Sequence, residues 1–322
     1  MRKVVDDIRL MTKVCDLYYN ESISQQEIAK KLSISRPTVS RLLSSAREIG
    51  VVKIQVADLE DIKHWDLENR IQEQYHLKEV IIVDSQETKD QTQEMLGRAA
   101  ARYLAYHMKD GITLGVSMGS TVYHMTSNIQ HMDVKNVRVV PMIGGQGQLR
   151  TELHANSIAE NLARAFGGSI TLIHAPARVS NVGLRDKLLK EDSLKDAFQY
   201  SSKIDLAVLG IGYPNAGSSI KATGYFNDQE IEELKRKHVA GEINMQFYDI
   251  NGEPYKDNDT VIGIALDKIR KIPISIGVAG GRDKADAVIG AIAGGYVNIL
   301  ITDMECAKVL DKSRSLEQDD QG

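Results

Sequence analysis

Two kinds of hydrophobic pattern follow one another along the chain. In the first 50 residues the apolar positions recur at helical spacing, three or four residues apart. From about residue 79, short β-branched runs alternate with further helical patterns, which is typical of βαβ units and a mostly parallel sheet. The pattern predicts an α-helical N-terminal part followed by an α/β part.

Three helices are predicted in the N-terminal part, and the first is the amphipathic segment 8–18. Ser24 and Glu27 have the spacing of a capping box, which begins a second, short helix. Ser35 is the expected N-cap of the third, where Pro37 lies in the first turn and its missing N–H is harmless. Two capped helices joined by a short turn indicate a helix-turn-helix.

The third helix is expected to place apolar residues toward a core and polar residues toward DNA. Arginine can pair bidentately with guanine, and serine and threonine can reach base edges or phosphates. The expected DNA-binding residues of this helix are Ser35, Arg36, Pro37, Thr38, Ser40 and Arg41. Any two capped amphipathic helices share this pattern, so its interpretation depends on the rest of the chain.

Charge distribution supports a DNA-binding head. Residues 1–56 contain ten Lys or Arg and six Asp or Glu, a net charge of +4, whereas the whole chain carries −4. The remainder is therefore acidic, as in a body that does not itself lie on phosphate. After Gly50, a natural helix stop, residues 51–56 form a predicted strand, from which Lys53 is expected to reach a phosphate as part of a winged head.

The length of 322 residues and the 42% hydrophobic content predict a globular protein of two domains. The acidic segment 57–64 interrupts the pattern, so we expect a DNA-binding domain over 1–56, a linker over 57–64 and an effector-binding and oligomerisation domain over 65–322. No apolar run could span a bilayer and the N-terminus lacks the apolar core of a signal peptide, so a cytoplasmic protein is expected. The two cysteines have no metal-like spacing and are expected to be reduced packing residues.

The α/β part contains six predicted strands. They span residues 80–83, 112–116, 137–140, 206–209, 274–278 and 297–301. In open parallel sheets the ligand crevice lies at the carboxyl ends of the strands. The residues that directly follow each strand are therefore candidates for binding.

Three loops that follow predicted strands have the composition of an anion site: 115–121, 144–147 and 280–284. Their small residues let the backbone approach a ligand, and N–H groups at a helix start can cradle a phosphate. Lys284 adds a positive charge. One such loop is more often only a tight turn, but three of them after parallel strands favour a shared anion site.

A dinucleotide site is not predicted. Gly210 and Gly212 are the first two glycines of G-x-G-x-x-G, but Asn215 occupies the third position and Pro214 interrupts the turn into a helix. No Walker motif is present either. We therefore expect no cofactor.

Taken together, the motifs closely resemble the SorC/DeoR-type class of bacterial sugar-responsive transcriptional regulators. The resemblance covers nearly the whole chain and is carried by residues 18–43, 115–121, 210–212, 223–225, 241–243 and 278–285. It implies an α/β fold with a winged helix-turn-helix head and a Rossmann-like effector domain similar to the phosphosugar isomerases. It further implies a homodimer or homotetramer, and a repressor of a carbohydrate-utilisation operon whose partners are operator DNA and a phosphorylated sugar.

The resemblance also implies roles for particular residues. The phosphate is expected at Gly119, Ser120, Thr121, Gly280, Gly281 and Lys284, with Gly144 and Gly145 lining the pocket. The sugar-contacting positions of the family fall on His154, Asn156, Lys221 and Glu242. An alternative interpretation is equally open, in which His154 and Asn156 satisfy a buried helix and the other two side chains are solvated.

A sugar-phosphate isomerase or deaminase is the alternative function. Aminosugar-phosphate deaminases use an Asp-Gly-His run after the Gly-Ile-Gly strand, where this chain has 213–217, with no acid, histidine or evident general base. Some regulators of the family bear Lys or Arg where this chain has Ile143, so covalent capture of a sugar as a Schiff base is not expected. The sequence thus predicts a binding protein and not an enzyme.

Overall fold

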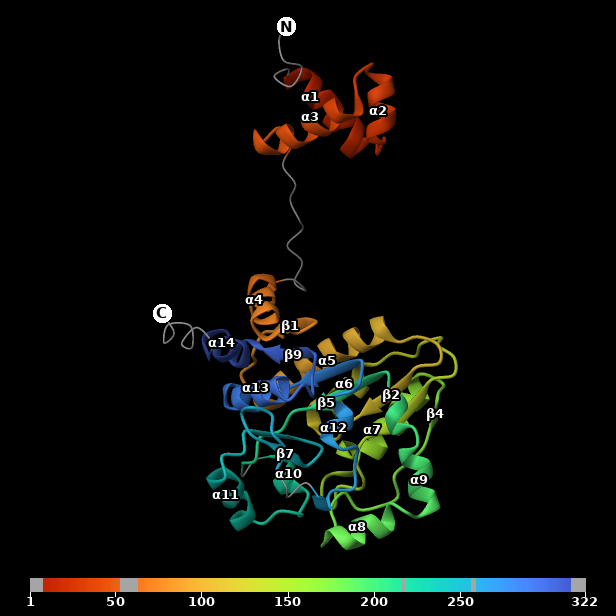
Figure 1. Ribbon diagram of the computed structural model, residues 1–322, viewed down its shortest axis with the longest axis vertical. Coiled ribbons are helices and arrows are strands. Elements are labelled where there is room, and N and C mark those ends of the chain that lie inside the picture. The colour runs from red at the N-terminus through yellow and green to blue at the C-terminus, as the bar shows by residue number, and fades with distance from the viewer. Residues whose placement is uncertain (1–7, 53–62, 216–217, 256–258, 314–322) are drawn as a thin grey trace. The chain divides into compact units, whose positions relative to one another are not determined.

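A computed structural model describes residues 8–52, 63–215, 218–255 and 259–313. The chain divides between Lys63 and His64 into two compact units, which are labelled in Figure 1 and are taken one at a time below.

The N-terminal unit is built from helices packed around one small core. They are α1 (Ile8–Cys15), the π-helix η2 (Asp16–Asn20), α2 (Gln25–Lys31) and α3 (Arg36–Glu48). The capping box of Ser24 and Glu27 and the N-cap at Ser35 are confirmed. The predicted first helix is α-helical only to Cys15 and continues as a π-helix, since the Glu21 N–H donates to the carbonyl of Asp16 five residues back.

The predicted strand after Gly50 is not seen in the residues that are described. Val51 and Val52 form a bend that packs on the helical core. Residues 53–56, including Lys53, and residues 57–62 of the expected linker lie outside the described ranges.

The second unit contains a seven-stranded sheet whose neighbouring strands all run parallel. Its order is β1-β9-β8-β5-β2-β3-β4, formed by Glu79–Val83, Ile299–Asp303, Ile274–Val278, Leu206–Gly210, Thr113–Val116, Arg138–Pro141 and Ser169–Ile170. The six predicted strands are confirmed, with ends displaced by at most two residues. The last is displaced most, because Val297 is buried before pairing begins and so extends the apolar run.

Helices cover both faces of this sheet (Figure 1). The longer helices are α4 (Trp65–Tyr75), α5 (Lys89–His107), α6 (Ser120–Asn128), α7 (Ala155–Ala165), α11 (Asp228–Arg236), α13 (Ala285–Ala293) and α14 (Met304–Ser313). Shorter elements are α8 (Val182–Leu188), α9 (Asp192–Phe198), α10 (Ser219–Ala222), α12 (Leu266–Ile269), η4 (Thr151–Leu153), η5 (Ser201–Lys203) and η7 (Arg282–Lys284). Trp65, the one tryptophan of the sequence, begins α4 and is 57% exposed.

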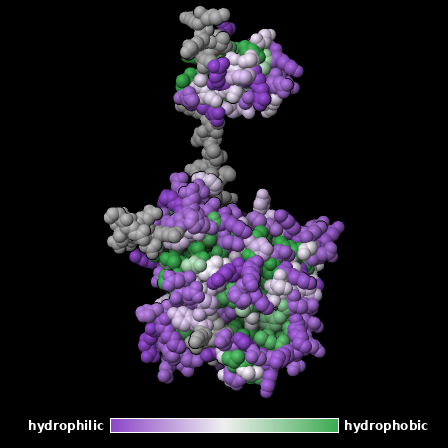
Figure 2. Space-filling model, viewed as in Figure 1, coloured by the Kyte–Doolittle hydropathy of each residue, from purple (hydrophilic) through white to green (hydrophobic). Residues whose placement is uncertain are grey.

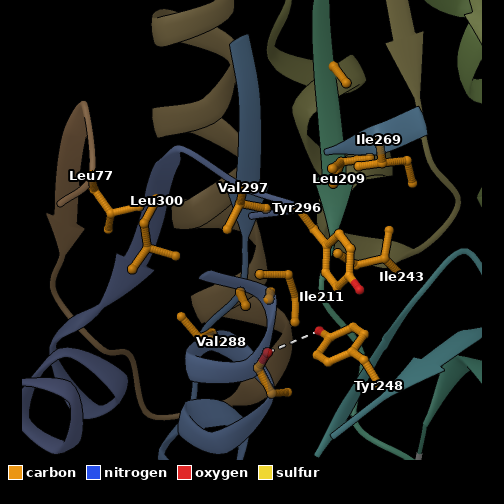
Figure 3. Packing of buried hydrophobic residues seen from close by; sticks show 14 of the residues in the cluster. Leu77, Leu209, Ile211, Ile243, Tyr248, Ile269, Val288, Tyr296, Val297 and Leu300 are labelled. Atoms are coloured by element: carbon orange, nitrogen blue, oxygen red, sulfur yellow. Dashed lines mark hydrogen bonds between the residues drawn. The ribbon is translucent and has the colours of Figure 1, made fainter. Parts of the chain in front are cut away.

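The sheet residues alternate between two hydrophobic cores. Leu206 and Val208 of β5 pack with α5, α6 and α7, whereas Ala207 and Leu209 pack with residues of α13 and α14. Burial on both faces explains why the strands appear in the sequence as continuous apolar runs. Figure 3 shows part of the second core, where the Tyr248 hydroxyl donates to the carbonyl of Ala287 at 2.9 Å.

A two-stranded antiparallel hairpin, β6 (Gly241–Ile243) and β7 (Gln246–Tyr248), lies outside the main sheet. Its first strand is tied to the loop after β5, because the backbones of Gly212 and Glu242 exchange two hydrogen bonds of 2.9 Å. The hairpin therefore extends the carboxyl edge of the sheet near β5.

The direction of winding reverses between β2 and β5. From β2 the chain proceeds outward to β3 and β4, and from β5 it proceeds the other way to β8 and β9. Such a topological switch point leaves a crevice at the carboxyl ends of the two central strands.

The visible surface in Figure 2 is largely hydrophilic, with small hydrophobic patches. Among the described helices, none is long and apolar enough to cross a membrane. Cys15 and Cys306 are both free and buried, in separate cores, which confirms them as packing residues.

Candidate functional site

A cleft of about 610 Å³ lies at the topological switch point. Segments that follow β1, β2, β5, β8 and β9 line it, together with the hairpin residues Glu242 and Asn244. The cleft therefore gathers the carboxyl ends of five parallel strands, which is where the strand pattern placed the candidates for binding.

The N-terminus of α6 forms one wall of the cleft. Gly119 precedes it with φ +119°, a conformation open to glycine but strained for other residues, and no described side chain caps the helix. The N–H groups of its first turn have no partner within the helix, and Ser120 and Thr121 of that turn line the cleft, so this end of the helix is suited to an anion.

The loop after β8 also lines the cleft and is held in place by Asp303. One carboxylate oxygen of Asp303 accepts from the Gly281 N–H at 2.9 Å, and the other accepts from the Ser85 hydroxyl at 2.7 Å. A Cβ at Gly280 would lie 2.7 Å from Leu96 Cδ1, so a larger residue there would displace that buried side chain. The loop therefore presents Lys284 from a fixed backbone.

Lys284 brings a positive charge to the lining of the cleft. Its Nζ donates to the Ile211 carbonyl at 2.9 Å. The side chain keeps some exposed surface, but the protein surrounds it closely enough for burial to lower its pKa, and Lys89 lowers that pKa further. The carboxylate of Glu242 partly offsets both effects. An anion bound in the cleft would stabilise this ammonium group in the same way.

Glu242 is 5% exposed and lines the same cleft as Lys284. Burial raises its pKa to about 7, an effect that the hydrogen bond from the Met245 N–H at 2.8 Å and the charge of Lys284 only partly offset. Near neutral pH this carboxyl group can therefore donate as well as accept a hydrogen bond. It is not solvated, contrary to the alternative interpretation.

Gly144 and Gly145 do not line the cleft. The segment after β3 pairs instead with two neighbouring segments: Gly144 donates to the Ile262 carbonyl at 2.9 Å and Gly145 to that of Ala175 at 2.7 Å. A Cβ at Gly144 would lie 2.6 Å from the carbonyl oxygen of Ala175. The expectation that these glycines line the pocket is therefore corrected, because both pair with neighbouring backbone and close backbone packing leaves no room for a side chain at Gly144.

Three expected sugar contacts also lie away from the cleft walls. His154 bonds through Nε2 to the Leu149 carbonyl at 2.8 Å, and the Asn156 amide bonds to both the N–H and the carbonyl of Ile173. Lys221 forms an ion pair with Asp228. The interpretation that His154 and Asn156 satisfy local structure agrees with these contacts.

Several lining residues were missed by sequence reasoning. Ser85 and Lys89 follow β1, and Asp303 and Glu305 end or follow β9. The rule that found the other loops could have found these, had the residues after the first and last predicted strands been considered. Asn244, at the tip of the hairpin, gave no comparable signal, since its strands are only three residues long.

The helix-turn-helix presents the expected polar face. Arg36, Ser40 and Arg41 are exposed along α3, opposite a buried stripe that begins at Val39. The Ser35 hydroxyl accepts from the Thr38 N–H at 3.3 Å and lies 2.8 Å from the Thr38 hydroxyl. The arginines are therefore the groups of this helix best placed to reach DNA.

Comparisons with known proteins agree with both units. A family model described as "Putative sugar-binding domain" matches residues 61–310, and one described as winged helix-turn-helix DNA-binding matches residues 17–53. The sorbitol operon regulator of Klebsiella pneumoniae is 32% identical over 95% of this chain and 99% of its own length. The deoxyribonucleoside regulator of Bacillus subtilis is 34% identical over 94% of this chain and 97% of its own.

A solved structure extends the likeness to three dimensions. The crystal structure of the full-length sorbitol operon regulator SorC from Klebsiella pneumoniae superposes with a TM-score of 0.73 at 31% identity, over 95% of this chain and all of that one. These relatives are named as regulators, not as enzymes. The chain therefore belongs to the SorC/DeoR family of sugar-binding regulators, as a DNA-binding transcriptional regulator with a sugar-binding domain.

Proposed function

We propose that this regulator represses a carbohydrate-utilisation operon and that a phosphorylated sugar, bound in the cleft, controls it. The observation that carries this proposal is the uncapped N-terminus of α6, with Ser120 and Thr121, in the same cleft as Lys284. Unpaired helix N–H groups and a partly desolvated ammonium group both favour an anion over a neutral ligand. The relatives named for sorbitol and deoxyribonucleosides support a carbohydrate as the rest of the effector.

The sugar is bound without a covalent bond in this proposal. Ile143, where some regulators of the family have Lys or Arg, is fully buried in a hydrophobic cluster and pairs with Gly263. The proposed phosphate contacts are Gly119, Ser120, Thr121, Gly280, Gly281 and Lys284, and Glu242 is the proposed sugar contact.

We propose further that the regulator acts in the cytoplasm as a homodimer or homotetramer. One recognition helix such as α3 covers too few base pairs for a useful specificity, and paired heads would read two half-sites. Sedimentation in the presence of operator DNA tests this, because a monomer that protects a full operator would contradict it.

A thermal-shift screen tests the nature of the effector. Sugar phosphates are compared with the same sugars lacking phosphate, at matched concentrations. A ligand at 100 times its Kd that binds only the folded state adds about 2.7 kcal/mol of stability, so the effector should stand out clearly. Equal shifts from phosphorylated and unphosphorylated sugars would contradict an anion site.

Two lysine variants locate the phosphate. Lys284→Ala removes a charge-assisted contact of about 1.5–3 kcal/mol, so effector affinity should fall roughly ten- to a hundredfold. Lys221→Ala is the matched control, since this lysine pairs with Asp228 outside the cleft lining, and it should retain the wild-type affinity. Equal losses in both variants would place the phosphate elsewhere.

A further inference from the structure

The tip of the β6–β7 hairpin places an asparagine in the cleft. Its two-residue turn, Asn244 and Met245, has φ of +53° and +59°, as in a type I′ hairpin turn. Asn244 lies two residues beyond Glu242 and lines the same cleft. The residue is only 2% exposed.

The amide of Asn244 is buried without a hydrogen-bond partner. Neither Nδ2 nor Oδ1 is bonded to any residue in the described part of the chain. The neighbouring buried amide, Gln246, is satisfied on both sides: Nε2 donates to the Ile264 carbonyl at 2.8 Å and Oε1 accepts from the Leu266 N–H at 3.1 Å. A buried donor and acceptor without hydrogen bonds cost free energy, so the burial of the Asn244 amide requires an explanation, whereas that of the Gln246 amide does not.

The turn alone does not explain this side chain. Asparagine is favoured where φ is positive, but glycine suits that conformation at least as well and buries no amide. The fold also anchors the turn independently of Asn244, because the Met245 N–H donates to Glu242 and the Met245 side chain is fully buried in a hydrophobic cluster.

We propose that Asn244 determines specificity by recognising a hydroxyl group of the sugar. This deepens the proposed function and rests on it. An amide offers one donor group and one acceptor group, and a hydroxyl group, which also donates and accepts, can satisfy both. The favoured effector is therefore a phosphorylated sugar or polyol that retains a hydroxyl at the position facing Asn244, and its deoxy analogue at that carbon is rejected.

The test pairs a change in the protein with a change in the sugar. The probes are ribose 5-phosphate, fructose 6-phosphate and glucitol 6-phosphate, each with its monodeoxy analogues, and inorganic phosphate as the reference. Asn244→Gly removes the amide and keeps the positive φ. Asn244→Asp keeps the shape but replaces the donor group by an acceptor.

Wild-type protein should bind one parent sugar phosphate at least about tenfold more tightly than one of its monodeoxy analogues. In Asn244→Gly this preference should shrink to less than about twofold, because the parent loses affinity and that analogue does not. Asn244→Asp should also lose the preference. Inorganic phosphate should bind the wild-type protein and Asn244→Gly alike, which shows that the glycine variant folds, and a cooperative thermal unfolding transition checks the folding of Asn244→Asp.

Each other outcome overturns a different claim. If Asn244→Gly changes the affinity for the parent and all its analogues by one common factor, or not at all, Asn244 is only a turn residue and the inference fails while the proposed function stands. If the wild-type protein binds inorganic phosphate and these sugar phosphates no better than the unphosphorylated sugars, the proposed function fails and this inference with it.

Discussion

At the scale of single residues, the cleft contains ionisable side chains, Glu242 and Lys284, whose charged forms are destabilised by burial. Glu242 has its pKa raised to about 7 by burial, while Lys284 and the Met245 N–H act in the opposite direction. Burial raises the pKa of the Tyr248 phenol, and the nearby carboxylate of Glu242 raises it further. The free energy of unfolding should therefore depend on pH through the protonation of Glu242.

The sign of this pH dependence follows from linkage. The folded chain holds the proton of Glu242 more tightly than the unfolded chain, so its stabilising contribution is complete below about pH 4.5 and is lost as the pH rises through about 7. The loss is about 3 kcal/mol. Urea unfolding from pH 5 to 8 should show wild-type protein losing stability relative to Glu242→Gln. Glu305→Gln, at an exposed position of the same cleft, should keep the wild-type slope.

Gly119 offers a second prediction, based on backbone conformation. A Cβ at Gly119 or at Gly111 would touch nothing within 4 Å, but both residues have positive φ, so alanine at either position should destabilise the fold by about 1 kcal/mol. Only Gly119→Ala alters the start of α6 and should weaken effector binding. Calorimetric titration of both variants checks this, and equal effector affinities would argue against the α6 anion site.

At this scale, the sequence predicted a cleft-lining residue correctly where the residue faces the cleft, but not where the same residue type packs against a neighbouring segment. Ser120 and Thr121 follow β2, Lys284 follows β8, and all three do line the cleft. Gly144 has the same sequence context, but the tertiary pairing of its segment with Ala175 cannot be seen in one strand and its loop. Glycine lines the cleft in one loop, at Gly119, and packs against a neighbouring backbone in the other.

At the scale of elements, continuous apolar runs predicted the central strands well, because burial on both faces leaves little room for other residues. The short strands β4, β6 and β7 were missed, since two or three residues carry no measurable period. The hairpin therefore could not be anticipated, and with it the position of Asn244.

Helix α3 carries the prediction for DNA. Arg36→Ala and Arg41→Ala should each weaken operator binding, by about 1–3 kcal/mol and in a base-dependent way where the arginine reads guanine. An arginine that grips phosphate should instead weaken all sequences alike and reduce the salt dependence. Arg164→Ala, on the exposed side of α7, is the control. Operator titrations at several salt concentrations distinguish these cases, and unchanged affinity in both variants would reject this orientation of α3.

At the scale of the whole molecule, the chain separates the DNA-reading helix from the cleft by a division at Lys63 and His64. Lys284→Ala should therefore leave operator affinity intact while it weakens the response to effector. By linkage the variant should respond again at proportionally higher effector concentration. Titrating effector against the preformed DNA complex measures this, and a wild-type midpoint in the variant would contradict the role of Lys284.

The position of Trp65 allows the division between the units to be studied by tryptophan fluorescence. The single indole of the protein begins α4, directly after the division between the units, and it is not among the residues that line the cleft. Its emission is thus a built-in, label-free optical reporter of the junction, insensitive to direct contact with the sugar. Acrylamide quenching measures how accessible the Trp65 indole is to solvent. Recorded while effector is added to the DNA complex, it would show whether effector binding changes the environment of the residue that follows the division.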